Sequence, residues 1–195
     1  MFMLTTFSDL VQIPPYEFYK KNRDEIEDKI NEKYANKVVP KVGFCICMYD
    51  LLKASDGLIG HGTGNANVKV EFRMIVFRPF KNEIINAEVK ICTPEGIQVS
   101  TRFFDDIYVP KTMLFDECVY VDAEKVWVWK TPENEYFFDP GTVVRVRVER
   151  ETWNSQSDTS TTALAENADA RARAQAPYSI EASIAEAGLG GEEWW

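Results

Sequence analysis

The sequence contains one histidine and four cysteines, and this scarcity excludes several kinds of chemistry. His61 stands among glycines, so a Ser-His-Asp or Cys-His catalytic arrangement has little support. Cys45 and Cys47 fall on one face of an expected strand, but no second cysteine or histidine pair completes a zinc site. Buried free thiols are the favoured interpretation. We therefore predict no catalytic residue, no metal site and no cofactor.

Long apolar runs are also missing. No run approaches the roughly 18 residues that a membrane-spanning helix requires, and the first residues alternate like a strand instead of forming a signal peptide. The sequence has no Asn-x-Ser/Thr glycosylation sequon. These absences, together with the few cysteines, predict no membrane contact and favour a reducing compartment, the cytosol or the nucleus.

Positive charge is scarce toward the C-terminus. The net charge of −9 divides into +1 for residues 1–80, −4 for residues 81–150 and −6 for residues 151–195. Non-specific nucleic-acid binding derives its free energy from neutralising phosphates. A chain with this balance would be a poor free-standing binder, so any RNA contact is expected to be local, weak or assisted.

The first 80 residues predict a small α+β domain with a short antiparallel sheet. A strand over residues 1–11 ends at Pro14 and Pro15, and apolar residues at helical spacing predict a helix over 22–36. Residues 42–52 are apolar on both alternations, which suits a strand covered on both faces. Residues 68–77 predict a strand with one wet face. Residues 78–81 are the expected junction.

Residues 81–195 predict an OB-type, S1-like β-barrel. Short strands with turn signals between them are expected at 84–91, 97–103, 107–109, 125–130, 136–138 and 142–149. Residues 154–176 are acidic and rich in Ser, Thr and Ala, which predicts a disordered insertion. Residues 178–189 regain apolar side chains and are expected to return to the barrel.

Two local patterns resemble chemical motifs without matching them. Gly60, Gly62 and Gly64 do not have phosphate-loop spacing, and no helix start follows them, so a hairpin tip is the better interpretation. Such a tip can still dock on a partner. Asp105 and Asp106 are adjacent, and neighbours on a strand point to opposite faces, so turn or strand-end residues are the better interpretation.

Aromatic and basic residues in the barrel half suggest a nucleic-acid face. Trp127 and Trp129 share one strand face, and Arg145 and Arg147 share another. OB-type barrels bind single strands with such mixtures of stacking rings and cations. The alternative is that the tryptophans face the barrel core or a neighbouring protein, and that the arginines form a solvated strand face.

Several segments together resemble the OB-fold-bearing stalk subunits of eukaryotic DNA-directed RNA polymerase III. They are NEKYANKVVPKVGFCICMYD (31–50), VFRPF (76–80), FFDDI (103–107), YFFDPG (136–141), PYSI (177–180), GLG (188–190) and WW (194–195). The resemblance covers nearly the whole chain except residues 154–176. It implies an N-terminal RNP-like domain whose tip docks on the polymerase core, and an outward-projecting OB-fold. It also implies a nuclear location.

The resemblance further implies a small helical partner in a heterodimer, contacts with transcription initiation factors, and weak contact with nascent RNA. On this basis we expect core docking through Pro14, Pro15, Gly60, Gly62 and Gly64, and RNA contact through Arg102, Trp127, Lys130, Arg145 and Arg147. The expected function is that of a non-catalytic subunit in the synthesis of small RNAs such as tRNA and 5S rRNA. A free-standing S1-type RNA-binding protein is the alternative. A small hydrolase or nuclease would need a nucleophile or metal cluster that we do not find.

Overall fold

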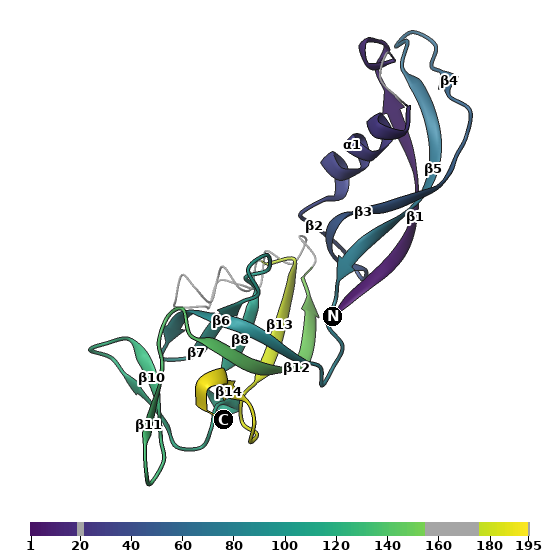
Figure 1. Cartoon of the computed structure of the whole chain (residues 1–195). Coiled ribbons are helices and arrows are strands. Elements are labelled where there is room, and N and C mark those ends of the chain that lie inside the picture. The colour runs from purple at the N-terminus through teal and green to yellow at the C-terminus, as the bar shows by residue number, and fades with distance from the viewer. Residues whose placement is uncertain (19–21, 155–175, 195) are drawn as a thin grey trace. The chain divides into compact units, whose positions relative to one another are not determined.

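Residues 1–18, 22–154 and 176–194 are described by a computed structural model. They divide into two units, Met1–Arg78 and Pro79–Trp195 (Figure 1). Within the described ranges, no helix is both long and apolar enough to cross a membrane. Each unit has a sheet structure of its own, and the first unit also has a helix.

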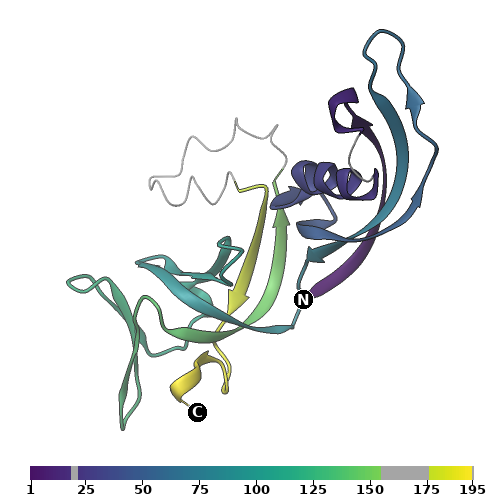
Figure 2. The same ribbon diagram turned by 45° about the horizontal axis from the view of Figure 1, so that its top comes forward.

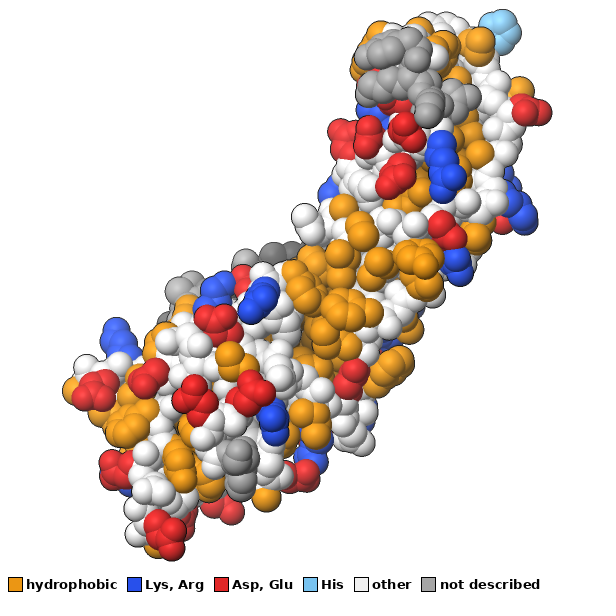
Figure 3. Space-filling view, viewed as in Figure 1, with side chains coloured by type: hydrophobic (Ala, Val, Ile, Leu, Met, Phe, Trp, Pro, Cys, Tyr) orange, Lys and Arg blue, Asp and Glu red, His pale blue; other side chains and the backbone are white. Residues whose placement is uncertain are grey.

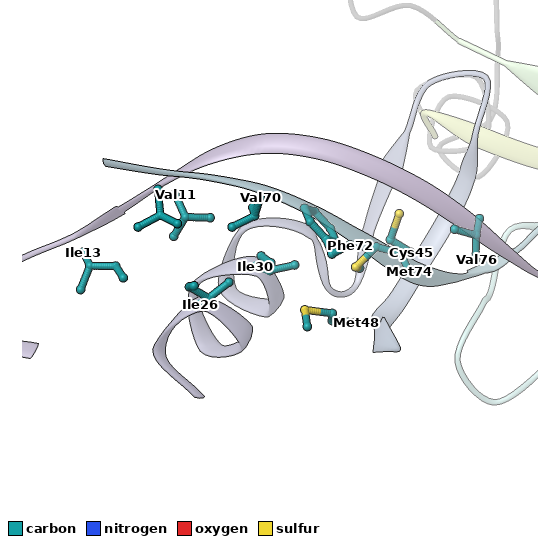
Figure 4. Close-up of a cluster of buried hydrophobic side chains, with 11 residues drawn as sticks. Val11, Ile13, Ile26, Ile30, Cys45, Met48, Val70, Phe72, Met74 and Val76 are labelled. Carbon is teal, nitrogen blue, oxygen red and sulfur yellow. The ribbon is translucent and has the colours of Figure 1, made fainter. Parts of the chain in front are cut away.

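Unit 1 (Met1–Arg78) is a curved antiparallel sheet with one helix on one of its faces (Figures 1 and 4). In spatial order its strands are β1 (Phe2–Ile13), β5 (Ala66–Phe77), β3 (Gly43–Ala54) and β2 (Lys37–Val39), and β4 (Leu58–Ile59) also pairs with β5. Helix α1 (Asn22–Tyr34) follows β1 and a short 3-10 turn, Pro15–Glu17. The predicted α+β domain is therefore confirmed.

The core of unit 1 lies between α1 and the sheet. Ile26 and Ile30, four residues apart on α1, are 3% and 1% exposed. They face alternate residues of β5, among them Val70 and Phe72, which are fully buried (Figure 4). Burying one such side chain contributes about 1.5–3 kcal/mol to stability. The apolar face of α1 and the apolar face of β5, both expected from the sequence, thus pack on each other.

The other face of β3 is not covered, so the prediction that residues 42–52 are covered on both faces is wrong. Cys45 and Met48 are buried, but Tyr49 is 58% exposed and Leu52 is 45% exposed. Helix α1 covers only one side of the sheet. In addition, register shifts in the pairing of β3 with β5 break the simple alternation of its side chains.

Polar contacts fix α1 to two strands. Lys33 Nζ and the Tyr34 hydroxyl donate to Asp9 Oδ2 on β1, at 2.5 and 2.8 Å. Asn31 Oδ1 accepts a 2.8 Å hydrogen bond from the backbone N–H of Met48, beside an irregularity of β3. These contacts hold the helix in a defined position over the core.

Unit 2 (Pro79–Trp195) contains a closed five-stranded barrel. Around the barrel the strands are β6 (Ile84–Thr93), β7 (Gly96–Ser100), β8 (Ile107–Pro110), β13 (Tyr178–Ser183) and β12 (Val143–Trp153), which pairs back to β6. β8 and β13 are parallel, and the other four pairs are antiparallel. This is the Greek-key arrangement of an OB-fold, which confirms the predicted barrel.

A second, three-stranded sheet is inserted between β8 and β12. It consists of β9 (Cys118–Val121), β10 (Val126–Lys130) and β11 (Glu135–Phe138), and its β10–β11 hairpin extends from one end of the barrel (Figures 1 and 2). Near the end of the chain, β14 (Gly190–Gly191) pairs with β12, and a 3-10 turn, Glu192–Trp194, follows. The strands β9 and β14 were not predicted because they are short and have no clear apolar alternation.

The predicted acidic insertion, residues 154–176, falls almost entirely on residues 155–175, outside the described ranges. Its two ends lie side by side. The backbone N–H of Asn154 donates to the Pro177 carbonyl at 3.1 Å, and Asn154 Nδ2 donates to the Ala176 carbonyl at 2.9 Å. The chain therefore leaves the barrel after β12 and re-enters it at the start of the paired strand β13.

Candidate functional sites

One end of unit 1 brings together the prolines and glycines predicted to dock. Pro14 follows β1 and precedes the Pro15–Glu17 turn, and residues 60–64 join β4 to β5. A Cβ placed on Gly64 would lie 3.3 Å from Cγ of Pro15, so these two segments are in contact. The side chain of the only histidine, pale blue in Figure 3, marks this end of the unit. We call this end, made of residues 14–18 and 58–65, the tip.

The glycines give the tip its tight turn. The backbone N–H of Gly60 donates to the Asn65 carbonyl at 2.8 Å, and that of Gly64 donates to the Gly60 carbonyl at 3.2 Å. Gly62 and Gly64 have φ angles of +83° and +71°, in the left-handed region that glycine adopts without a Cβ clash. The predicted hairpin tip is confirmed.

Exposed apolar side chains surround this turn, and the sequence did not predict them. Tyr16, Leu58 and Ile59 are 72%, 73% and 70% exposed, and Phe18 is 44% exposed. Beside them is a groove lined by Phe18 and Ile59 and floored by core residues such as Ile26. Grouped exposed apolar side chains mark interaction surfaces. The one available signal was the apolar pair Leu58-Ile59 inside a glycine-rich, polar loop.

The arginines predicted to contact RNA are balanced by neighbouring carboxylates. Arg147 Nε donates to Glu149 Oε1 at 2.8 Å, and the same guanidinium pairs with Glu186. The hydrogen bonds to Glu186 and Glu149 raise the pKa of Arg147 above its ordinary value. Arg145 Nη2 lies 3.5 Å from Glu192 Oε1. A phosphate approaching β12 would have to compete with these carboxylates.

Trp127 is buried in the core, which agrees with the alternative to RNA contact given by the sequence. Its side chain is 6% exposed, its Nε1 donates to the Thr93 carbonyl at 2.9 Å, and its ring tilts against Tyr120. A base could stack on this ring only if the β9–β11 sheet moved. Trp129 does lie on the same face of β10, as predicted, and it stacks on Phe115 with a centroid separation of 4.1 Å.

The remaining predicted cations lie on different elements. Arg102 is exposed in the β7–β8 connection, with a φ of +66°. Lys130 lies at the end of β10 and pairs with Glu135 at 3.1 Å. The five residues predicted for RNA contact are therefore spread over the β7–β8 connection, β10 and β12.

The adjacent carboxylates, Asp105 and Asp106, lie in the β7–β8 connection, as predicted for turn or strand-end residues. Hydrogen bonds from Lys90 and Ser100, at 2.5 and 2.6 Å, lower the pKa of Asp105. Burial, with the charge of Asp105 adding to it, raises the pKa of Asp106. No metal-binding cluster of His, Cys, Asp and Glu occurs among the residues that the structure describes.

Comparison with known proteins assigns both units. Residues 83–195 match the family model described as RNA polymerase III subunit Rpc25. Residues 8–64 match the SHS2 domain found in the N terminus of Rpb7p, Rpc25p and MJ0397.

Whole-length relatives carry the same assignment. The chain is 39% identical to DNA-directed RNA polymerase III subunit rpc8 of Schizosaccharomyces pombe, and 100% of each chain is covered. It is 40% identical to subunit RPC8 of Bos taurus, over 100% of this chain and 98% of that protein. The RNA polymerase II subunit RPB7 of Saccharomyces cerevisiae is 28% identical over 51% of this chain and 59% of that protein.

An SHS2 unit followed by an OB-type barrel, with relatives in RNA polymerases II and III, defines the Rpb7-like class of RNA polymerase stalk subunits. Within that class, the chain belongs to the RNA polymerase III subunit Rpc25 family. The resemblance found in the sequence segments is thereby confirmed.

Proposed function

We propose that the chain serves as a non-catalytic stalk subunit of DNA-directed RNA polymerase III in the nucleus. In this role it forms a heterodimer with a small helical partner, docks on the core enzyme and supports transcription initiation. It also contacts nascent RNA weakly during the synthesis of small RNAs such as tRNA and 5S rRNA. The observation that carries the proposal is the match to polymerase III subunits over the full length of the chain.

Docking on the core is proposed to use the tip, through Pro14, Pro15, Gly60, Gly62 and Gly64. Contact between Pro15 and Gly64 gives the tip one continuous surface, and the exposed apolar side chains beside it supply area to bury on a partner. Burial of apolar surface contributes about 25 cal/mol per Å². The glycines keep the turn narrow enough to enter a recess.

Shortening the 60–64 turn tests this proposal. Deleting residues 61–63 removes exposed side chains and hydrogen bonds of the turn but no core residue, so unit 1 should keep its core and its unfolding midpoint. Association of the variant with a polymerase III core lacking its stalk should weaken, as measured by co-purification. His61→Ser with Thr63→Ser, which keeps Gly62 and the loop length, is the matched control. Undiminished association of the deletion variant would rule out the tip as the docking element.

RNA contact is proposed to be weak and to depend on cations of unit 2, namely Arg102, Lys130, Arg145 and Arg147. All of these except Arg102 already pair with carboxylates. A phosphate would therefore replace an existing partner, and the net free energy of RNA binding would be small. Trp127 could contribute stacking only after the inserted sheet opens.

A triple exchange, Arg102→Gln, Arg145→Gln and Arg147→Gln, tests the RNA proposal. Crosslinking of nascent RNA to the assembled polymerase should fall, and the salt slope of RNA binding should decrease by about one for each phosphate that is no longer neutralised. Unchanged crosslinking would refute RNA contact at these residues. Strong, salt-dependent RNA affinity of the isolated chain would instead favour the free-standing S1-type protein.

A further inference from the structure

The β10–β11 hairpin carries an open hollow with aromatic walls. It is lined by Trp129, Tyr136, Trp194 and the turn residues 131–134. Trp129 and Tyr136 lie directly opposite each other on β10 and β11, with ring centroids 5.3 Å apart. Trp194 comes from the far end of the chain, and its ring lies 5.1 Å from Tyr136 and 5.9 Å from Trp129. Three rings from two distant segments therefore meet at one place.

Backbone contacts hold the third wall in position. A Cβ added to Gly190 would lie 2.8 Å from the Trp194 ring, and one added to Gly191 would lie 2.4 Å from it. The indole therefore packs directly on this backbone, which β14 attaches to β12. The rings of Phe138 and Trp194 also meet edge to face, with a centroid separation of 4.8 Å. The hollow is formed by packing and does not depend on a chance side-chain conformation.

The surroundings of the hollow are acidic. Segments 115–118, 129–136 and 192–194 contain six carboxylates and one lysine. That lysine, Lys130, pairs with Glu135, and Arg145 of β12 pairs with Glu192, so the six carboxylates outnumber these two cations by four. Glu133 lines the hollow itself. In Figure 3, acidic side chains border hydrophobic ones at the end of unit 2 that bears the hairpin. Such a field attracts cations and repels phosphates.

We propose that this hollow binds a lysine or arginine side chain from a basic segment of a partner protein. Aromatic faces attract a cation that lies within about 6 Å of the ring centroid, and a desolvated site strengthens the attraction. The Glu133 carboxylate adds a charge partner. Single-stranded RNA would also stack on aromatic rings, but its phosphates would meet the surrounding carboxylates. The proposal requires neither core docking by the tip nor RNA contact by the arginines.

Nuclear magnetic resonance of the indole N–H groups of the full chain tests this binding. The probes are acetyl-Gly-Arg-Gly-amide, the citrulline analogue of that peptide, which has nearly the same shape but no charge, and a uridine pentanucleotide. Single Trp-to-Phe exchanges assign the resonances. The arginine peptide should shift the Trp129 and Trp194 signals in a saturable way and leave the buried Trp127 signal in place. The citrulline peptide should shift them at least severalfold less.

Two variants separate the contribution of the Glu133 carboxylate from that of the Trp194 ring. Glu133→Gln should weaken arginine-peptide binding severalfold, whereas Glu124→Gln, an exposed exchange of the same charge on the β9–β10 turn, should leave it unchanged. Trp194→Leu should weaken binding by about two- to thirtyfold, the range expected for a cation–aromatic contact. Equal binding of the citrulline peptide, preferential binding of the uridine oligomer, or no binding of any probe would each overturn the proposal. If Trp194→Leu disturbs the fold, the Glu133→Gln result decides whether the hollow binds a basic side chain.

Discussion

The exposed pair Leu58 and Ile59 offers the sharpest test of the tip. Both side chains are at least 70% exposed in the free protein, so replacing both with threonine removes little that stabilises unit 1. Surface exchanges of this kind usually change the free energy of unfolding by less than about 0.5 kcal/mol each. Threonine also suits the short strand β4, because it is β-branched.

The exchange should change the free energy of binding to the core much more than the free energy of unfolding. Full burial of a leucine or isoleucine side chain contributes about 1.5–3 kcal/mol, and threonine retains part of that area. A loss of about 1 kcal/mol per site, about 2 kcal/mol together, raises the Kd for the core by about thirtyfold. Surface-immobilised core enzyme lacking its stalk would measure the Kd, and urea unfolding would measure stability.

The matched control exchanges two exposed apolar side chains of unit 2 for threonine. Ile84 and Ile91 are 59% and 45% exposed, and their exchange to threonine should leave the Kd for the core within about twofold of wild type. If Leu58→Thr with Ile59→Thr binds the core as tightly as wild type does, apolar burial at the tip does not drive docking.

Three further predictions concern the fold itself. Phe72→Ala removes a fully buried ring that packs on Phe7 and Tyr34, and should cost unit 1 about 3–5 kcal/mol in urea unfolding, whereas the partly exposed Phe103→Ala should cost far less; equal losses would contradict the core assignment. Asp105 has a lowered pKa, so its stabilising contribution is present above about pH 4 and disappears as pH falls through the folded value. The difference in urea midpoint between wild type and Asp105→Asn should therefore hold above about pH 5 and shrink below about pH 4, and a difference independent of pH would exclude the Asp105–Lys90 pair as its source. Cys45 is buried and Cys118 is half-buried, and burial raises the pKa of both thiols to about 11. Iodoacetamide at pH 8 should therefore label Cys45 only after unfolding and Cys118 slowly in the native chain, and mass spectrometry showing rapid native labelling of Cys45 would refute its burial.

The sequence predicted the parts of the fold whose periodicity is strong. Ile26 and Ile30 gave α1 its buried face, and the strict alternation of residues 68–77 gave β5 one buried and one wet face. The prediction that both faces of β3 are covered is wrong because apolar residues on both alternations do not reveal how many layers cover a strand. One helix covers one face of this sheet, and bulges displace the alternation at Met48.

The sites were harder to predict because they depend on pairing across the chain. The contact between Pro15 and Gly64 could be guessed from turn chemistry, but the exposure of Leu58 could not, since an apolar residue in a loop is equally compatible with burial. Arg147 looked like a free cation in the sequence, yet its carboxylate partner Glu186 follows the last barrel strand, far along the chain. Likewise, no local pattern links Trp194 to the hairpin.

Affinity purification of the tagged chain from its native cells, followed by quantitative mass spectrometry, tests the proposed stalk role most directly. We expect recovery of the large RNA polymerase III subunits together with one small partner at equal stoichiometry to the chain. Recovery of ribosomal or RNA-decay proteins without any polymerase subunit would contradict that role.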